Sequence, residues 1–369
     1  MSEPQKIVLI LGNGFDLDLG LKTSYKDFYE SENCPKSYPS PLIDHLNKSW
    51  PNNLDKVRWY DLENELFNYC KSVQRPGPIQ DVITIDERRF LKEVNPASIA
   101  FGIDNKYINV AKSLMSKGYL IRNYYGHYSF PYIEDVQEST YWRDKKAFNL
   151  IKEGLCKYIG SLSNGQSPED SIALQVLFAV DCSRRANHFL DIYSFNYTSI
   201  PVDYGDGFMD CVHYVHGNCA DGNIIIGTKD DSTIGEHYDF LQKSFDPFYK
   251  PPVLVADLLV ADEVIFFGHS IGENDRQYFK AFFKQQTDYS HPNKKKITIF
   301  TLDDNSEVAI KRSLQKMTDN NLATLYGLND LCIIKTASIK NSYGDFESFL
   351  KRFITDERLV KATLEKVIR

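Results

Sequence analysis

The chain has 369 residues, of which 42% are hydrophobic and 25% are charged, and its formal net charge is -7. This composition is that of a folded protein with a sizeable core, built as one large domain or two interwoven ones. The acidity disfavours a general nucleic-acid binder, which usually carries a basic face. No apolar run reaches the length needed to span a bilayer, so we expect no membrane partner.

The N-terminal segment MSEPQKIVLI has no basic region followed by a long apolar stretch and a cleavage site. We therefore expect no signal peptide and a cytoplasmic protein. The seven cysteines are scattered, and none forms a C-x-x-C pair. This spacing indicates neither a disulfide framework nor a zinc site, so we expect reduced cysteines and no metal.

The first predicted strand is KIVLILG (6–12), a run typical of a strand buried on both faces of a parallel sheet. It leads into GNGFDLDLG (12–20). Glycines after a strand let N–H groups approach an anion, and Asn13 and Asp16 are turn and cap formers. A turn without a ligand is equally compatible, because neither the full G-x-G-x-x-G spacing nor the P-loop lysine is present.

About 160 residues of different character separate this strand from the next one. Apolar residues recur there at three- and four-residue spacing, as at Phe148, Ile151 and Leu155. We expect a helical insertion in the first crossover of the sheet, with helices over 59–73, 107–120, 144–162 and 168–180.

Later apolar runs predict the remaining strands, over 190–196, 211–217, 223–228, 263–270 and 296–303. Each run ends near Gly, Asn, His, Ser or Asp. Ligands of open α/β sheets bind at the carboxyl ends of the strands, so these polar residues are candidates for a site. Residues 346–369 form a charged amphipathic pattern that predicts one helix or a pair.

Two strand ends carry groups suited to catalysis. Asn196, in YSFNYTSI, can cap a helix or can fix a water or a ribose hydroxyl through its amide. His216 precedes Gly217, where no bulky side chain hides the imidazole, and histidine is suited to proton transfer near neutral pH. Its neighbour His213 is better explained by packing within the strand.

The segment FFGHSIGENDRQYF (266–279) offers a backbone nest and a hydroxyl that suit a phosphate or a ribose. Gly268, His269 and Ser270 carry this prediction. An ordinary capped loop is the alternative, with Ser270 or Asn274 as the cap. In TLDDN, Asp303 or Asp304 can accept from ribose hydroxyls or adenine, although exposed capping aspartates are equally common.

Taken in order, five motifs resemble the bacteriophage abortive infection AbiH family over most of the chain. They are ILGNGFDLDLGLKTSYKDF, WYDLENEL, FNYT, YVHG and FGHSIGENDRQYF. More distantly they resemble the sirtuin-like NAD-binding fold, whose motifs are G-A-G-x-S with a G-I-P step, Q-N-x-D, H-G and G-T-S. The positions that match these motifs are Gly12, Gly14, Gly20, Leu21, Asn196, His216, Gly217, Gly268 and Ser270.

The departures from the sirtuin motifs bear on the activity. Asp16 replaces the usual Ser, Asn13 replaces Ala and His269 replaces Thr. A carboxylate near a pyrophosphate is unfavourable unless it caps the helix. The four-cysteine zinc module of protein-deacetylating sirtuins is missing, so the resemblance implies cleavage of NAD itself rather than deacetylation.

The resemblance implies an α/β fold with a Rossmann-like (sirtuin-like), mostly parallel sheet and a large helical insertion after the first strand. We expect the sheet domain over 1–30 and 186–345, the insertion over 31–185 and a C-terminal helix over 346–369. The insertion is expected to cover the mouth of the pocket. Glu63, Trp59 and Tyr60 are its candidates for facing inward, although simple packing is favoured for the two aromatic residues.

By the same resemblance, the protein is an antiphage effector that binds and hydrolyses NAD to nicotinamide and ADP-ribose. His216 is the expected base, and Asn196 orients the water or the nicotinamide ribose. The expected nucleotide-binding residues are Gly12, Asn13, Gly14, Phe15, Asp16, Gly20, Gly268, His269, Ser270 and Asp303. Gly12, Asn13, Gly14, Asn196, His216, Gly268 and Ser270 are expected to meet in one pocket.

Two other functions are compatible with the same residues. One is a non-catalytic sensor of NAD, ADP-ribose or a related nucleotide. The other is a nuclease, in which Asp16, Asp303 and His216 are metal or acid/base groups. The expected partners are a small-molecule nucleotide and a phage trigger whose identity is open, as is a homo-oligomeric state.

Overall fold

The computed structural model describes most of the chain. The described residues are 4–53, 61–73, 90, 108–116, 121–122, 128–129, 133–162, 170–202, 204–205, 207–230, 234, 236–251, 253–290 and 294–368. The expected Trp59 and Tyr60 lie outside these ranges. No described helix combines the length and the apolar character needed to cross a membrane.

The core of the fold is a six-stranded sheet in the order β5-β4-β1-β6-β7-β8, and every neighbouring pair is parallel. The strands are β1 (Lys6–Leu11), β4 (Phe189–Ser194), β5 (Val212–Tyr214), β6 (Glu263–Phe267), β7 (Lys296–Thr301) and β8 (Asp330–Lys335). The chain starts at the centre, builds outward to β5, and then returns to build the other half from β6. The direction of strand succession therefore reverses between β1 and β6, which is where open α/β sheets hold ligands.

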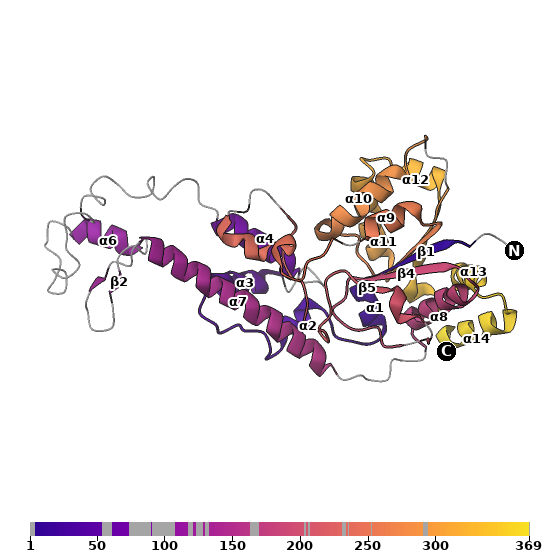
Figure 1. Cartoon of the computed structure of the whole chain (residues 1–369), viewed down its shortest axis with the longest axis horizontal. Coiled ribbons are helices and arrows are strands. Elements are labelled where there is room, and N and C mark those ends of the chain that lie inside the picture. The colour runs from indigo at the N-terminus through magenta and orange to yellow at the C-terminus, as the bar shows by residue number, and fades with distance from the viewer. Residues whose placement is uncertain are drawn as a thin grey trace.

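Helices cover both faces of this sheet (Figure 1). One face packs in a common hydrophobic cluster with α1 (Asn13–Asp18), α8 (Ile172–Arg185), α13 (Gly344–Phe353) and α14 (Glu357–Ile368). The other face packs with α9 (Leu254–Val260), α10 (Arg276–Gln285), α11 (Asp304–Met317) and α12 (Leu322–Leu328). Since both faces are buried, the inner strands are almost wholly apolar.

A separate group of helices follows β1 and has its own hydrophobic cluster. The cluster contains residues of α2 (Tyr25–Glu30), α3 (Pro41–Asn53), α4 (Leu62–Val73) and the long α7 (Ile133–Ser161). Helix α6 (Ile108–Ser116) and a small antiparallel pair of β2 (Ile121–Arg122) and β3 (Tyr128–Ser129) lie between α4 and α7 in the sequence. Figure 1 shows α7 running away from the sheet. In contrast, α8 falls within the range 31–185 expected for the insertion, yet its buried residues pack with the sheet.

Short 3-10 turns complete the described elements. They are η4 (Met209–Cys211), η5 (Glu236–Leu241), η6 (Lys243–Phe245), η7 (Glu273–Asp275) and η8 (Thr336–Ser338).

Five of the six predicted strands are confirmed, one is wrong, and one strand of the six-stranded sheet was missed. Residues 223–228 are not a strand: Ile224 and Ile226 pack in the cluster of the insertion helices, and Ile225 N–H donates to the carbonyl of His216. Strand β8 was not predicted, because it lies at the edge of the sheet and only one of its residues is fully buried. The C-terminal pattern forms a pair of helices, α13 and α14.

Candidate functional site

The loops after β1 and β6 pack directly against each other at the switch point. The N–H of Gly12 donates to the carbonyl of Phe267 (3.0 Å), and that of Gly14 donates to the carbonyl of Gly268 (2.9 Å). A Cβ at Gly14 would lie 2.5 Å from Cα of Gly268, and one at Gly12 would lie 2.5 Å from Cα of His269. The glycines thus permit close backbone contact between two loops. Contrary to expectation, the N–H groups of Gly12 and Gly14 are not available to an anion.

Asp16 joins helix α1 to the segment that follows β4. Its side chain is buried and accepts from Asn196 Nδ2 at 3.1 Å and from Thr198 Oγ1 at 2.9 Å. Asn196 Nδ2 also lies 3.1 Å from the carbonyl of Gly12. Asp16, named above as a residue able to cap a helix, does not cap α1, since Gly12 occupies the N-cap position and the carboxylate is used by Asn196 and Thr198. Burial raises the pKa of Asp16 to about 6, although the Thr198 hydrogen bond opposes this shift.

Asn13 is the residue of the first loop with an unused donor. Its Oδ1 accepts from Thr23 Oγ1 at 2.6 Å. Its Nδ2 is buried and has no hydrogen-bond partner within the part of the chain that the structure describes. A buried amide N–H₂ without a partner is costly, so this atom is a plausible contact for an acceptor on a ligand.

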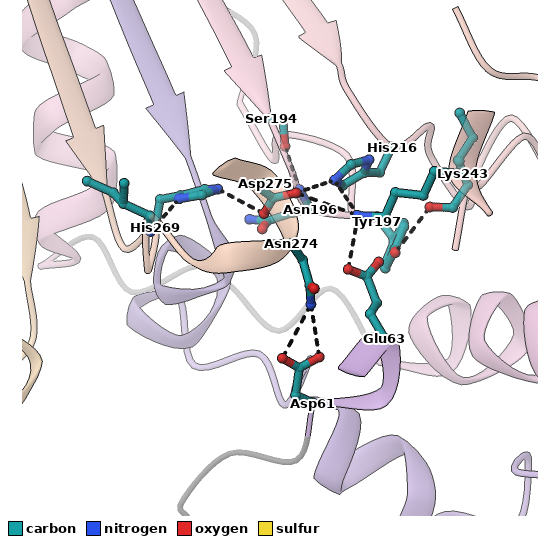
Figure 2. Close-up of polar contacts among 12 residues, drawn as sticks. Asp61, Glu63, Ser194, Asn196, Tyr197, His216, Lys243, His269, Asn274 and Asp275 are labelled. Carbon is teal, nitrogen blue, oxygen red and sulfur yellow. Dashed lines mark hydrogen bonds and ion pairs between the residues drawn. The ribbon is translucent and has the colours of Figure 1, made fainter. Parts of the chain in front are cut away.

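A polar cluster lies beside these loops, and it consists of Glu63, His216, Lys243, His269 and Asp275 (Figure 2). We call it the buried polar cluster, because its first four members are buried and Asp275 is half-buried. Lys243 Nζ is at its centre, 2.9 Å from Glu63 Oε2, 3.2 Å from His216 Nε2 and 3.5 Å from Asp275 Oδ1. Asp275 also contacts both histidines, at 3.2 Å from His216 Nε2 and 3.5 Å from His269 Nε2. The cluster therefore links α4, the loop after β5, η6 and the start of α10.

The charges of the cluster follow from its burial. Burial alone would lower the pKa of Lys243, but the nearby carboxylates of Glu63 and Asp275 more than offset it and raise that pKa. Burial opposes ionisation of Asp275 as well, yet Lys243 and His216 hold its pKa well below the usual range. Burial raises the pKa of Glu63 to about 7 despite Lys243. These shifts favour the charged forms of Lys243 and Asp275 at neutral pH, while the pKa of Glu63 lies near neutrality.

His216 is neutral at physiological pH. Burial and the adjacent Lys243 ammonium lower its pKa to about 4, although Asp275 opposes this. Because its Nε2 contacts both groups, it either accepts from Lys243 or donates to Asp275, depending on the tautomer. The expectation of an uncovered imidazole is wrong: the side chain is only 5% exposed. It packs against the ring of Phe195 and is held by a tight turn at Gly217, whose φ is 73°.

His269 is fixed on both sides of its ring. Its Nδ1 accepts from the N–H of Ile271 at 2.9 Å, so Nε2 carries the proton in the neutral form and points to Asp275. Ile271 itself has a positive φ of 49°, a conformation that a β-branched residue seldom adopts. The loop after β6 is therefore held in a strained form that places both His269 and Asp275.

The helical insertion reaches the strand-end loops through the start of α4. Glu63 contacts Lys243, and Asp61 accepts from Asn274 Nδ2 at 3.3 Å. Figure 2 shows both carboxylates pointing toward the loops of the sheet. Glu63 thus faces inward as expected.

Three residues expected to bind a nucleotide have other contacts, and a fourth, Ser270, is exposed to solvent. Gly20, with a φ of 78°, closes the turn after α1, and the side chain of Phe15 is buried against Phe267. Asp303 accepts from the N–H of Ser306 at 2.9 Å and caps α11. Of the seven residues expected to share a pocket, contacts join Gly12, Gly14, Asn196 and Gly268, and His216 lies in the buried polar cluster.

His213, in the strand that leads into the loop carrying His216, was expected to pack within the sheet. The ring of His213 packs against that of Tyr193 in the neighbouring strand β4, with ring centroids 4.8 Å apart. Its side chain is 45% exposed, and Nε2 lies 3.2 Å from Asp191 Oδ1. Among the described residues, no group of three or more His, Cys, Asp or Glu side chains is arranged to hold a metal ion.

The sequence pattern missed Lys243, Asp275 and Thr198. Lys243 belongs to a segment without regular periodicity, and lysine is almost never fully buried unless paired. Asp275 lies within FGHSIGENDRQYF, where its acidic neighbours suggested only a helix start. Thr198 follows Asn196 by two residues, and this spacing could have suggested that both side chains contact the same residue, which is Asp16.

Comparison with known proteins identifies the family. A family model described as bacteriophage abortive infection AbiH matches residues 8–296, which is well over half of the chain and includes every residue of the buried polar cluster. No curated protein and no solved structure matches the chain. The protein therefore belongs to the AbiH family of bacteriophage abortive infection proteins.

Proposed function

We propose that this AbiH protein is an abortive-infection effector that binds NAD at the carboxyl ends of β1, β4, β5 and β6 and hydrolyses its bond to nicotinamide. The observation that carries the proposal is the meeting of the loops after these four strands at the switch point. The strand succession is that of dinucleotide-binding α/β sheets, in which the ligand lies across this point. The proposal includes a sirtuin-like relationship of the sheet domain.

The first loop offers one contact for the nucleotide. Since the N–H groups of Gly12 and Gly14 are taken, the unpartnered Nδ2 of Asn13 is the proposed donor to a phosphate or ribose oxygen. This assigns the glycines to close packing and the asparagine to ligand binding. Asn13 stands where the sirtuin motif has alanine, so this mode of binding differs from the one that the motif implies.

His216 has the protonation state that a base needs. It is neutral at pH 7, and Asp275 at 3.2 Å would stabilise the imidazolium formed when it accepts a proton from water or from a ribose hydroxyl. The departing nicotinamide is neutral and the ribose becomes oxocarbenium-like. That step requires a ribose fixed in position, the exclusion of bulk water and one oriented nucleophile. Asn196 is the residue proposed to orient the nucleophile.

The described conformation is a resting state under this proposal. His216 is buried, and Lys243 lies 3.2 Å from the nitrogen that would accept the proton. Substrate can use His216 only after Lys243 has moved away. We therefore expect low activity until a phage trigger acts, as suits an effector that stops the cell from supporting phage replication.

A sensor of NAD or ADP-ribose is the second candidate, and the burial of His216 favours it. The test is to incubate purified protein with NAD, with and without lysate of phage-infected cells, and to measure nicotinamide and ADP-ribose by chromatography. Release of nicotinamide that requires His216 supports hydrolysis. Tight NAD binding without release, in both conditions, supports the sensor, and cleavage of nucleic acid in a parallel assay would support the nuclease.

A further inference from the structure

Two cysteines far apart in the sequence face each other across the contact between the insertion and the sheet. Cys156 lies in helix α7, and Cys219 lies in the turn after β5. Their Sγ atoms are 3.1 Å apart, and both residues are free cysteines with partial exposure. We propose that Cys156 and Cys219 form a reversible disulfide when the protein meets a peroxide, and that this bond ties α7 to the turn that carries His216.

The geometry requires little movement. A disulfide has its sulfur atoms about 2.05 Å apart, so the two Sγ atoms need to approach by roughly 1 Å. The turn that carries Cys219 is held by its own hydrogen bonds: Cys219 N–H donates to the carbonyl of Tyr197 at 2.9 Å, and Asn218 Nδ2 donates to Ser199 Oγ at 2.9 Å. Both sulfurs are therefore presented to each other by ordered segments.

The two thiols differ in a way that suits the reaction. The neighbouring Cys219 thiol lowers the pKa of Cys156, and Lys152 one turn earlier in α7 acts in the same direction. Contact with Cys156, together with burial, raises the pKa of Cys219. Cys156 is thus the attacking thiolate and Cys219 the resolving thiol.

The chemistry balances with hydrogen peroxide as oxidant. The Cys156 thiolate attacks one peroxide oxygen, the O–O bond breaks, and a sulfenic acid and hydroxide form, the latter taking up a proton to become water. The sulfur of Cys219 then attacks the Cys156 sulfur, and the hydroxyl group leaves as a second water with the thiol proton. Two thiols and one peroxide become one disulfide and two waters.

The bond would act on the candidate site through a short path. Cys219 is three residues from His216, and its turn is bonded to the segment that follows Asn196. A covalent link to α7 would restrict separation of the insertion from these strand ends. The inference concerns the thiols alone and does not depend on the proposed NAD hydrolysis.

The test counts and maps thiols in the full-length folded protein. The chain has seven cysteines. After brief treatment with stoichiometric hydrogen peroxide, removal of the oxidant and denaturation, we expect five titratable thiols, which follows from losing two of seven, and all seven after dithiothreitol. Peptide mass spectrometry should show one linked pair containing Cys156 and Cys219.

Matched variants separate this reaction from general oxidation. Cys156→Ser should retain all six of its thiols under the same treatment, one fewer than the seven of the natural chain. Cys219→Ser should instead lose one thiol, as a sulfenic acid at Cys156 that dithiothreitol restores, and should form no linked peptide. Cys332→Ser, which changes a partly exposed cysteine elsewhere, should still lose two. In protein unfolded in urea before oxidation, a disulfide between Cys156 and Cys219 should form no more often than disulfides between other cysteines. The proposal is overturned if oxidation yields sulfinic acid at Cys156 without the linked peptide, or if the linked pairs are the same mixture in folded and unfolded protein.

Discussion

Nζ of Lys243 lies 2.9 Å from Oε2 of Glu63, and the side chains are only 2% and 9% exposed. The pair joins the insertion to the loops of the sheet, because Glu63 belongs to α4 and Lys243 to η6 beside the strand ends. Breaking a buried ion pair leaves its partner uncompensated, whereas exposed pairs contribute little. The pair is therefore central both to the docking of the insertion and to the state of His216.

We first predict that Lys243→Met destabilises the protein by about 3–5 kcal/mol, the usual cost of removing one member of a buried pair. The measurement is urea unfolding followed by circular dichroism at pH 7.5. The matched control is Lys351→Met, which breaks the exposed pair with Glu347 and should leave the unfolding midpoint almost unchanged. Equal effects of the two substitutions would contradict a structural role for Lys243.

The second prediction concerns backbone contact between the loops after β1 and β6. Gly14→Ala should destabilise the protein by about 3 kcal/mol or more, since its Cβ would lie 2.5 Å from Cα of Gly268. Gly327→Ala is the control, because that glycine lies in α12 with open space around it, and alanine there should stabilise by up to about 1 kcal/mol. Tolerance of Gly14→Ala would show that the loops are not packed as described. For the same reason, bulky substitutions at Gly14 cannot serve as clean tests of nucleotide binding.

The third prediction follows from the lowered pKa of His216. Its folded-state pKa is about 4 against an unfolded value of 6.5, so the unfolded state binds more protons between these values. The stability that this group contributes is complete above pH 6.5 and is lost as the pH falls to 4, by about 3 kcal/mol from the shift. Wild type should therefore lose about this much stability relative to His216→Gln between pH 7 and pH 4.

Other groups oppose this trend, so the comparison with the variant is essential. The pKa of Glu63 is raised to about 7, and the folded state then binds more protons than the unfolded state between pH 4.5 and 7. Its contribution falls as the pH rises through that window. Glu63→Gln should accordingly steepen the loss of stability toward acid pH. A difference between wild type and His216→Gln that does not change with pH would refute the shift at His216.

The sheet could be predicted from the sequence because its inner strands are buried on both faces. The run over 264–267, for example, has no polar residue on either face to obscure the pattern. The same reasoning wrongly predicted a strand over 223–228, since an apolar run buried against the insertion helices has the same sequence pattern as a strand buried in a sheet. The edge strand β8 was not predicted because it contains polar and half-buried residues.

The site was only partly predictable, since its members are joined by contacts rather than by sequence spacing. Asn196 and His216 stand at strand ends, where the general rule for open sheets directs attention. Lys243 and Asp275 become important only because folding brings them within 3.5 Å of each other and desolvates both. No sequence periodicity indicates that two distant charged residues will be buried together. Glycine spacing alone also could not distinguish a phosphate-binding loop from close packing of two loops.

The fourth prediction tests the proposed hydrolysis. A general base contributes to the transition state more than to ground-state binding, so His216→Ala should reduce nicotinamide release by about 10²–10⁴-fold while NAD affinity changes little. His213→Ala is the control, because that histidine lies in the neighbouring strand β5 but is exposed and bonded to Asp191. Chromatography measures the release and calorimetry the binding, with phage protection scored in cells expressing each variant. If His216→Ala and His213→Ala release nicotinamide equally fast, His216 is not the base. If His216→Ala instead loses NAD binding and phage protection together, and the wild type releases no nicotinamide, the buried polar cluster belongs to a nucleotide sensor and not to a hydrolase.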